Sequence, residues 1–300
     1  MFENLFSLGG LSIDRLKSFV EVAEKGAIAR VADGDPSRQS LISRQIGELE
    51  AFFGTELTRR KGKGLELTEA GQELARQVRL QFQGLADFKA SCSGLPVEFR
   101  IAAGNSVIEW LLAPAMAGIA RALPDSRFVL LDSRTGEAVR GLLDHTVDFA
   151  IIRRSAVVQP LRFRPAGRFG YACFIPKTLD ARGKKPPEDL PLALSMGGDF
   201  FESFQRAASK AGESPNVVYR CTSFTQAAQL VRSGVCGAIL PRIAAPFLAR
   251  EASIHELPWL KPVTRDLGIA WHRRLTDIRP LAEKLLGAME DSFVRALQKS

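Results

Sequence analysis

The pattern of apolar residues changes at Pro96, and this change constrains the fold more than any other feature of the sequence. Before Pro96, apolar positions recur with helical spacing, as in Leu16, Phe19 and Val20. After it, short apolar runs alternate with helical segments, which is typical of sheets built from strand–helix–strand units. The 300 residues also suffice for about two domains of roughly 100–200 residues. The sequence therefore predicts a helical N-terminal part and an α/β C-terminal part.

The N-terminal part is expected to begin with a helix over 12–25, capped by Ser12 and ended by Gly26. A short helix over 27–33 follows. The sequence DGDP at 33–36 is turn chemistry, because its proline disfavours helical backbone at the preceding residue.

A third helix is expected to begin near Ser37 or Arg38 and to run to about Phe53. Apolar side chains recur along it with helical spacing and could pack inward: Leu41, Ile42, Ile46, Leu49 and Phe53. Its remaining face is polar, and periodicity alone does not distinguish a solvated face from one that binds a partner.

The next residues indicate a wing and a long helix. Two short, partly alternating segments, 55–58 and 64–67, flank the basic sequence RRKGKG, which predicts a two-stranded wing with a basic tip. A helix from Thr68 to about Cys92 follows. Apolar residues recur along it near heptad spacing and favour a dimerising helix: Leu74, Val78, Leu85 and Phe88.

The C-terminal part contains two sets of strands and helices. Strands are expected at 99–104, 128–133, 148–152, 170–176, 190–195, 217–223, 237–241 and 267–272. Helices are expected from near Ser106 and over 136–143, 224–233 and 278–298. The late return of the chain predicts two lobes, joined by crossing segments near 158–168 and 260–268.

Three consecutive segments of the N-terminal part together form a motif that resembles a known protein family. FVEVAEKGAIARVA is followed by QSLISRQIGELEAFFGTEL and then by RRKGKGLELTEAG. The arrangement S-R-Q-I-x-x-L-E-x-x-x-G, followed by L-T-x-A-G, resembles the LysR-type transcriptional regulators, and the resemblance covers nearly the whole chain.

The resemblance implies an α+β multidomain fold. It places a winged helix-turn-helix domain at 1–68, a linker and dimerisation helix at 69–95, and an effector-binding domain at 96–300. The last would be a two-lobed α/β domain like the periplasmic binding proteins, with lobe I at about 96–160 and 268–300 and lobe II at about 164–266.

The chain departs from the family pattern before, within and after the third helix. Val31 stands where alanine is usual, Asp35 where leucine is usual, Arg38 where serine is usual and Thr58 where phenylalanine is usual. The acid at position 35 replaces a core leucine. We therefore expect the turn into the third helix to be built differently here.

The candidate DNA-binding residues lie in the first half of the third helix, which the resemblance identifies as a recognition helix, and in the wing. Arginine pairs with guanine and glutamine with adenine in the major groove, while clustered cations bind phosphates. Residues 1–95 hold 13 basic and 13 acidic residues, so the argument rests on local clustering and not on net charge. The acids Glu48 and Glu50 are expected to face away from DNA or to be paired. The candidates are Arg38, Gln39, Ser40, Ser43, Arg44, Arg59, Arg60, Lys61 and Lys63.

The candidate effector-binding residues follow strands or precede helices of the two lobes, where hydroxyl and backbone N–H groups bind anions. They are Asn105, Ser106, Arg134, Thr135, Ile152, Arg153, Ser195, Met196, Thr222 and Ser223. Each hydroxyl could equally be a helix cap. Residues 153–168 also hold five arginines and no acid, which favours an anionic effector if some of them face the cleft; a solvated surface or a subunit contact is the alternative.

These observations predict a cytoplasmic, sequence-specific transcription factor that binds a double-stranded operator and a small, anionic effector. The expected assembly is a homodimer or homotetramer, with no cofactor, no metal and no membrane segment. An enzyme is not expected, because no G-x-S-x-G, P-loop or H-E-x-x-H motif is present and the three histidines are scattered. A ligand-independent repressor or structural DNA-binding protein is the alternative. The sequence does not specify the effector, the operator, the target genes or the direction of regulation.

Overall fold

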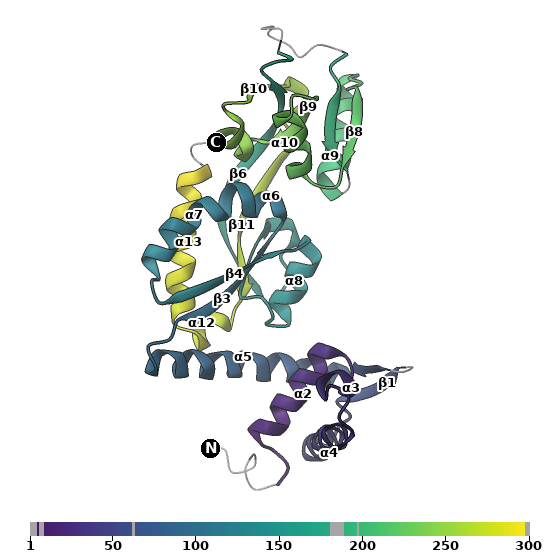
Figure 1. The fold of residues 1–300 in the computed structure, drawn as a ribbon, viewed down its shortest axis with the longest axis vertical. Helices are drawn as coiled ribbons and strands as arrows, with labels where there is room; N and C mark the ends of the chain where they lie inside the picture. The colour runs from purple at the N-terminus through teal and green to yellow at the C-terminus, as the bar shows by residue number, and fades with distance from the viewer. Residues whose placement is uncertain (1–4, 6–8, 62–63, 181–188, 197, 298–300) are drawn as a thin grey trace. The chain divides into compact units, whose positions relative to one another are not determined.

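The computed structural model describes residue 5 and residues 9–61, 64–180, 189–196 and 198–297 of the chain. It contains two compact units, both drawn in Figure 1. The first comprises Met1–Leu95 and Leu143–Thr146, and the second comprises Pro96–Leu142 and Val147–Ser300.

Helices dominate the first unit. They are α2 (Ile13–Lys25), α3 (Ile28–Val31), α4 (Pro36–Phe53) and α5 (Glu69–Cys92). The Oγ of Ser12 accepts the N–H of Arg15 at 3.2 Å, and Gly26 ends α2 in the left-handed region, so both predicted ends of that helix are confirmed. Phe19 of α2 is fully buried against the apolar face of α4.

The turn into α4 is built around Asp35. Its carboxylate accepts the N–H groups of Ser37 at 2.8 Å and of Arg38 at 3.3 Å. Pro36 occupies the first helical position, where a missing N–H costs nothing, so α4 begins one residue earlier than predicted. The acid that replaces the usual core leucine therefore serves as the N-cap of this helix.

Only part of the predicted apolar face of α4 reaches the core. Ile42, Ile46 and Leu49 are buried. Leu41 is 43% exposed and Phe53 is 39% exposed, so the prediction that these two could pack inward is wrong. Leu41 lies about 100° around the helix from Ile42, and Phe53 is the last residue of α4, beyond the buried side chains.

The wing is an antiparallel pair of strands, β1 (Thr58–Lys61) and β2 (Gly64–Leu67). The predicted first strand, 55–58, is displaced, because the arginines assigned to the tip belong to β1. Leu57 is buried in the core and its N–H, like that of Thr58, donates to Glu50, so the ladder begins only beyond this anchor. Lys63 lies outside the described residues.

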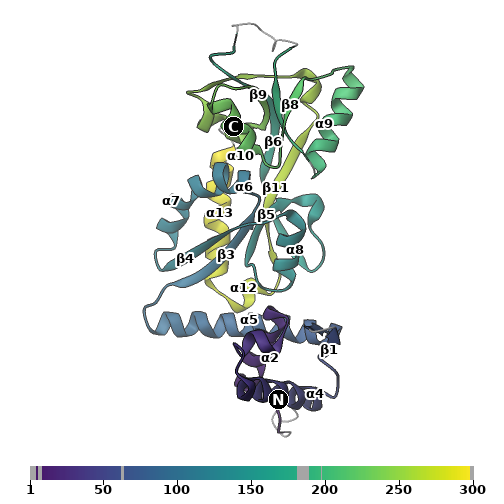
Figure 2. The ribbon, with the colours of Figure 1, turned by 45° about the vertical axis from the view of Figure 1, so that its right-hand side comes forward.

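The second unit is a nine-stranded mixed sheet in the order β4-β3-β5-β11-β6-β9-β7-β8, with β10 paired to β6. The long antiparallel strands β6 and β11 connect its two halves, as Figure 2 shows. They occupy the crossing segments predicted from the sequence. The first lobe carries β3 (Val97–Ala103), β4 (Ser126–Asp132) and β5 (Phe149–Arg153); the connecting strands are β6 (Leu161–Pro176) and β11 (Thr264–His272); the second lobe carries β7 (Leu192–Ser195), β8 (Val217–Cys221), β9 (Gly237–Pro241) and β10 (Ala252–His255).

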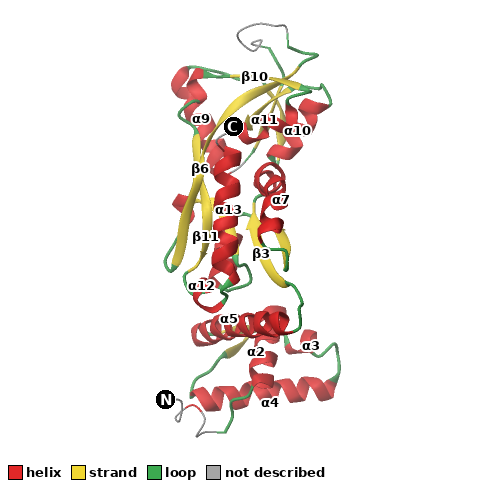
Figure 3. Cartoon of the chain, turned by 90° about the vertical axis from the view of Figure 1, so that its left-hand side faces the viewer, coloured by secondary structure: helices red, strands yellow, loops and turns green. Residues whose placement is uncertain are grey.

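Helices cover both lobes, and Figure 3 shows α7 and α13 side by side in the first of them. The first lobe has α6 (Asn105–Val107), a π-helical turn (Ile108–Leu112), α7 (Ala113–Ala122), α8 (Thr135–Leu143), α12 (Leu275–Ile278) and α13 (Leu281–Leu297). The second has α9 (Gly198–Ala211), α10 (Phe224–Arg232) and α11 (Ala245–Leu248). Short 3₁₀ turns cover Arg154–Ala156, Arg242–Ala244 and Pro258–Leu260.

Helix α9, strand β10 and the short helices α11 and α12 were not predicted. Phe200, Phe204 and Ala208 of α9 are buried at four-residue spacing, but two glycines and an acid at its start obscure this pattern. The predicted helix over 278–298 is shorter than expected and begins at Leu281, because Pro280 separates it from α12.

Candidate functional site

The polar face of α4 lies opposite its buried face. Ile42, Ile46 and Leu49 point into the core of the first unit. The candidates Arg38, Ser40, Ser43 and Arg44 are exposed, and Gln39 is half-buried. The Oγ of Ser40 donates to the carbonyl of Pro36 one turn earlier, at 3.0 Å.

Both acids of α4 are paired, as expected. Glu48 accepts from Nε of Arg15 at 2.5 Å and also lies 3.8 Å from Nε of Arg44. Glu50 accepts the N–H of Leu57 at 2.8 Å and the N–H and hydroxyl of Thr58 at 3.0 and 3.1 Å. Glu48 therefore joins α4 to Arg15 of α2, and Glu50 joins α4 to the start of the wing.

The wing presents Arg59 and Arg60 as exposed side chains, and Lys61 ends its first strand. Arg59 lies 3.8 Å from the carboxylate of Glu56, an ion pair whose two side chains are more than 70% exposed. Such an exposed pair is weak and leaves the arginine available to a phosphate.

A charged cluster lies where β5 of the first lobe faces α9 of the second. Arg153, at the end of β5, forms an ion pair with Asp199 in the first turn of α9. The same carboxylate oxygen lies 3.6 Å from Nη1 of Arg265 on β11. Nε of Arg265 also donates to the phenol oxygen of Tyr171 on β6 at 3.2 Å. We call these four residues the inter-lobe cluster.

Burial and neighbouring charges shift the pKa values of two residues of this cluster. Burial, and then the positive charge of Arg265, lower the pKa of Arg153, which at neutral pH remains charged. Burial raises the pKa of Tyr171, although Arg265 and Arg153 counteract part of that effect. Tyr171 therefore keeps its proton at neutral pH and remains a hydrogen-bond donor.

Aromatic rings surround the phenol of the inter-lobe cluster. The ring of Tyr171 lies 4.3 Å from that of Phe200, 5.8 Å from that of Phe224 and 6.0 Å from that of Phe169, measured between centroids. An apolar surrounding of this kind strengthens the electrostatic interactions of the nearby arginines.

The predicted effector residues are divided among several places. Arg153 belongs to the inter-lobe cluster, and Ile152 is buried in the strand before it. Asn105 instead lines a different pocket of about 290 Å³, together with Trp110 and Gln226. Ser106 follows it in the same short helix.

Several of the predicted residues have local structural roles. The hydroxyl of Ser223 accepts the N–H of Gln226 and caps α10, while the N–H and hydroxyl of Thr222 both donate to the amide oxygen of Gln226. The N–H of Arg134 donates to Glu137 as α8 begins, with Thr135 as its first residue. Ser195 is buried at the end of β7, and the N–H of the following Met196 donates to the carbonyl of Cys221.

The arginine-rich segment 153–168 does not converge on one site. Arg164 pairs with two glutamates of α13, and Arg168 forms two hydrogen bonds to Asp266. Arg154 lies over the ring of Phe163, 5.7 Å from its centroid. Among these arginines, Arg153 is the one that contacts the inter-lobe cluster in the described part of the chain.

Sequence reasoning missed three of the four residues of the inter-lobe cluster. Arg265 stands just before the predicted strand 267–272, and Tyr171 lies within a predicted strand whose apolar pattern concealed its hydroxyl. Asp199 lies in α9, which was not predicted. The position of Arg265 within the crossing segment predicted near 260–268 was a usable signal.

Within the described ranges, no helix is long and apolar enough to cross a membrane. Over the same ranges, no group of three or more His, Cys, Asp or Glu side chains could hold a metal ion.

Each of the two units matches a known protein family. Residues 13–72 match the family described as "Bacterial regulatory helix-turn-helix protein, lysR family", and residues 94–293 match the "LysR substrate binding domain". The regulator DgdR of Burkholderia cepacia is 29% identical over 262 residues, 84% of this chain and 85% of the relative.

Solved structures share the fold. Full-length LysG from Corynebacterium glutamicum, with bound effector Arg, has a TM-score of 0.65 at 20% identity and covers 95% of this chain and 99% of its own. Full-length CbnR in complex with its target DNA has a TM-score of 0.58 at 20% identity and covers 94% of this chain and 100% of its own.

A helix-turn-helix unit joined to a two-lobed α/β unit defines a DNA-binding transcriptional regulator with an effector-binding domain. The chain belongs to the LysR family of such regulators.

Proposed function

We propose that this regulator responds to a small carboxylate or similar anion bound between the lobes of its second unit. The observation that supports this most strongly is the convergence of Arg153 and Arg265 on one carboxylate, that of Asp199. Two guanidinium groups and the nearby phenol of Tyr171 are the donor set that a ligand carboxylate needs. An anion would replace Asp199 on these donors, and the aromatic rings would contact its apolar part.

The first half of α4 would read the operator in the major groove. Arg38, Gln39 and Arg44 suit base edges, and the hydroxyls of Ser40 and Ser43 suit bases or phosphates. The wing residues Arg59, Arg60, Lys61 and Lys63 would bind phosphates and supply affinity that depends on salt.

The regulator would act as a homodimer, or as a tetramer of two dimers, assembled through α5. Leu85 is 57% exposed and Phe88 is 69% exposed on this helix, so a second copy of α5 would cover apolar surface. Effector binding would favour one arrangement of the subunits, because it binds that arrangement better. The proposal includes no cofactor and no catalytic role.

Titration calorimetry with a panel of small carboxylates tests the effector site. We expect at least one compound to bind, and Arg153→Gln to weaken that binding about tenfold or more, which corresponds to roughly 1.4 kcal/mol. Arg154→Gln is the matched control, since its neighbouring guanidinium lies over Phe163 and not on Asp199. Equal loss in both variants, or no effect of Arg153→Gln, would contradict the proposed site.

A further inference from the structure

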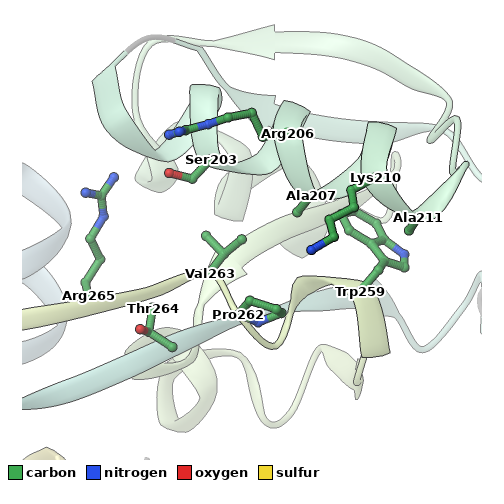
Figure 4. A pocket seen from close by; sticks show the side chains of 10 residues that line it. All are labelled: Ser203, Arg206, Ala207, Lys210, Ala211, Trp259, Pro262, Val263, Thr264 and Arg265. Atoms are coloured by element: carbon green, nitrogen blue, oxygen red, sulfur yellow. The ribbon is translucent and has the colours of Figure 1, made fainter.

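A second pocket lies in the second lobe, between α9 and the segment that leads into β11. Its volume is about 520 Å³, within the range of small-molecule sites. Figure 4 shows Lys210 extending from α9 toward the segment that carries Trp259 and Pro262. The lining residues that matter here are Ser203, Arg206, Lys210, Trp259, Thr264 and Arg265.

Positive charge dominates the lining of this pocket. Arg206, Lys210 and Arg265 line it, and no acidic residue does. Nε of Arg206 donates to a backbone carbonyl of its own helix, and neither Arg206 nor Lys210 forms an ion pair with a carboxylate in the described part of the chain. Arg265 differs, because Asp199 lies 3.6 Å from it. Among the described residues, the pocket therefore offers two cations that form no ion pair with a carboxylate.

The helical spacing of α9 brings its polar groups to one side. Ser203, Arg206 and Lys210 stand at positions i, i+3 and i+7, which share a face of a helix. Thr264 adds a hydroxyl from the opposite wall. The hydroxyl of Ser203 already donates to the carbonyl of Asp199 at 2.6 Å, so Arg206, Lys210 and Thr264 are the groups that can donate to an anion in this pocket.

The remaining wall is flat and apolar. Trp259 is half-buried and packs edge-on against Phe204, with ring centroids 5.4 Å apart, and Pro262 and Val263 continue this wall. An indole held in this way offers a flat surface to a planar ring.

We propose that this pocket is a second ligand site, for a dianion that carries a planar ring. The two cations set the charge of the ligand, and the wall formed by Trp259 selects the ring. This site is distinct from the inter-lobe cluster, because Arg153, Tyr171 and Asp199 do not line it. Arg265, the fourth residue of the cluster, also lines the pocket, so its guanidinium would lie next to both ligands.

Two planar dianions serve as probes: phthalate represents aromatic dicarboxylates, and adenosine 5′-monophosphate represents phosphate monoesters. Phthalamide and adenosine are their neutral counterparts. Tryptophan fluorescence reports on the pocket, because Trp110 and Trp271 are buried while Trp259 is partly exposed. Calorimetry on the same full chain gives the affinities.

We expect saturable binding of at least one dianion, a change in Trp259 fluorescence, and much weaker binding of the neutral counterpart. The double variant Arg206→Gln/Lys210→Gln should bind the dianion at least about tenfold more weakly. Arg220→Gln, an exposed arginine on β8 outside the pocket, is the control and should bind normally. Binding of phthalate would indicate a dicarboxylate ligand, and binding of adenosine 5′-monophosphate would indicate a phosphate monoester.

Three results would overturn the proposal. Neither dianion binds saturably; or the double variant binds as well as the wild type; or Arg153→Gln alone abolishes binding, which would place the probe in the inter-lobe cluster. Failure of the proposed effector site leaves this test unaffected, because that site is probed through Arg153.

Discussion

Asp199 holds two arginines that would otherwise repel each other. Arg153 and Arg265 are close enough that the charge of Arg265 contributes to the lowered pKa of Arg153. The carboxylate of Asp199 relieves this repulsion while no ligand is bound. An anionic effector bound as we propose would therefore compete with a side chain of the protein itself, which would weaken its apparent affinity.

Asp199→Asn should tighten binding of a carboxylate effector. The substitution keeps the shape of the side chain and removes the competing charge, so we expect an affinity gain of about tenfold by calorimetry. Glu202→Gln, one turn later on the same helix, is the control and should have little effect. Weaker binding by Asp199→Asn would show that Asp199 contacts the ligand favourably instead of competing with it.

A second charged pair stabilises the first lobe from within. Arg279 donates to Asp148 at 2.5 Å and to the carbonyl of Glu98 at 2.6 Å, and its guanidinium lies over the ring of Phe99. Both side chains of the pair are only 3% exposed. Removing Arg279 would leave the buried carboxylate of Asp148 without its opposite charge, although the N–H of Arg100 donates to it at 2.7 Å.

Arg279→Met should therefore lower the free energy of unfolding by about 3–5 kcal/mol, measured by urea denaturation. Arg100→Gln removes an ion pair whose two side chains are about half exposed, and should cost less than about 1 kcal/mol. Similar losses in the two variants would show that burial does not determine the strength of these pairs.

At the scale of elements, the start of α5 depends on a glycine. Thr68 caps this helix by accepting the N–H of Gly71 at 3.0 Å. A Cβ atom on Gly71 would lie 2.0 Å from the carbonyl oxygen of Leu57, which is backbone and cannot move aside easily. The sequence L-T-x-A-G thus permits the helix to approach the segment before the wing.

Gly71→Ala should destabilise the first unit by more than about 1 kcal/mol, because the gain in helix propensity cannot offset the clash. Gly47→Ala on α4 is the matched control: its Cβ would meet nothing within 4 Å, so stability should stay the same or rise. Thermal unfolding of both variants measures the two changes in stability. A stable Gly71→Ala chain would mean that the two backbones are not held this closely.

The success of sequence reasoning differs between elements for a physical reason. The ends of α2 and α5 depend on neighbouring residues such as Ser12, Gly26 and Thr68, so the sequence predicts them well. The start of β1 depends on Glu50 of another helix, and the inter-lobe cluster depends on the pairing of β6 with β11, which local patterns do not encode. Arg153 could be found from its place at a strand end, whereas Asp199 could not.

At the scale of the whole molecule, the cysteines distinguish interior from surface. Cys92 is exposed, and Cys173, Cys221 and Cys236 are buried. Burial raises the pKa of all three buried thiols, to about 12 for Cys173 and to about 11 for Cys236. Since the thiolate is the reactive form, these three should be inert in the native protein.

A thiol-reactive disulfide reagent at pH 8 should therefore modify Cys92 first, and Cys92→Ser should remove the fast phase. All four thiols should react after denaturation. Fast reaction of any second thiol in the native chain would show that the interior of the second unit is open to solvent.

We propose above that the first half of α4 recognises DNA. Two kinds of contact with DNA can be distinguished, those to bases and those to phosphates. A base contact discriminates among sequences, whereas a phosphate contact weakens binding to all of them when it is lost. We propose that Arg44 makes the first kind of contact and that Arg59 of the wing makes the second.

The most direct test compares these arginines on an operator selected with the wild-type chain and on random DNA of equal length, by fluorescence anisotropy at several salt concentrations. We predict that Arg44→Ala costs about 1–3 kcal/mol on the operator and much less on random DNA. Arg59→Ala should weaken both about equally and lower the salt slope by about 1. Equal loss on both DNAs for Arg44→Ala would contradict the claim that this face of α4 reads sequence.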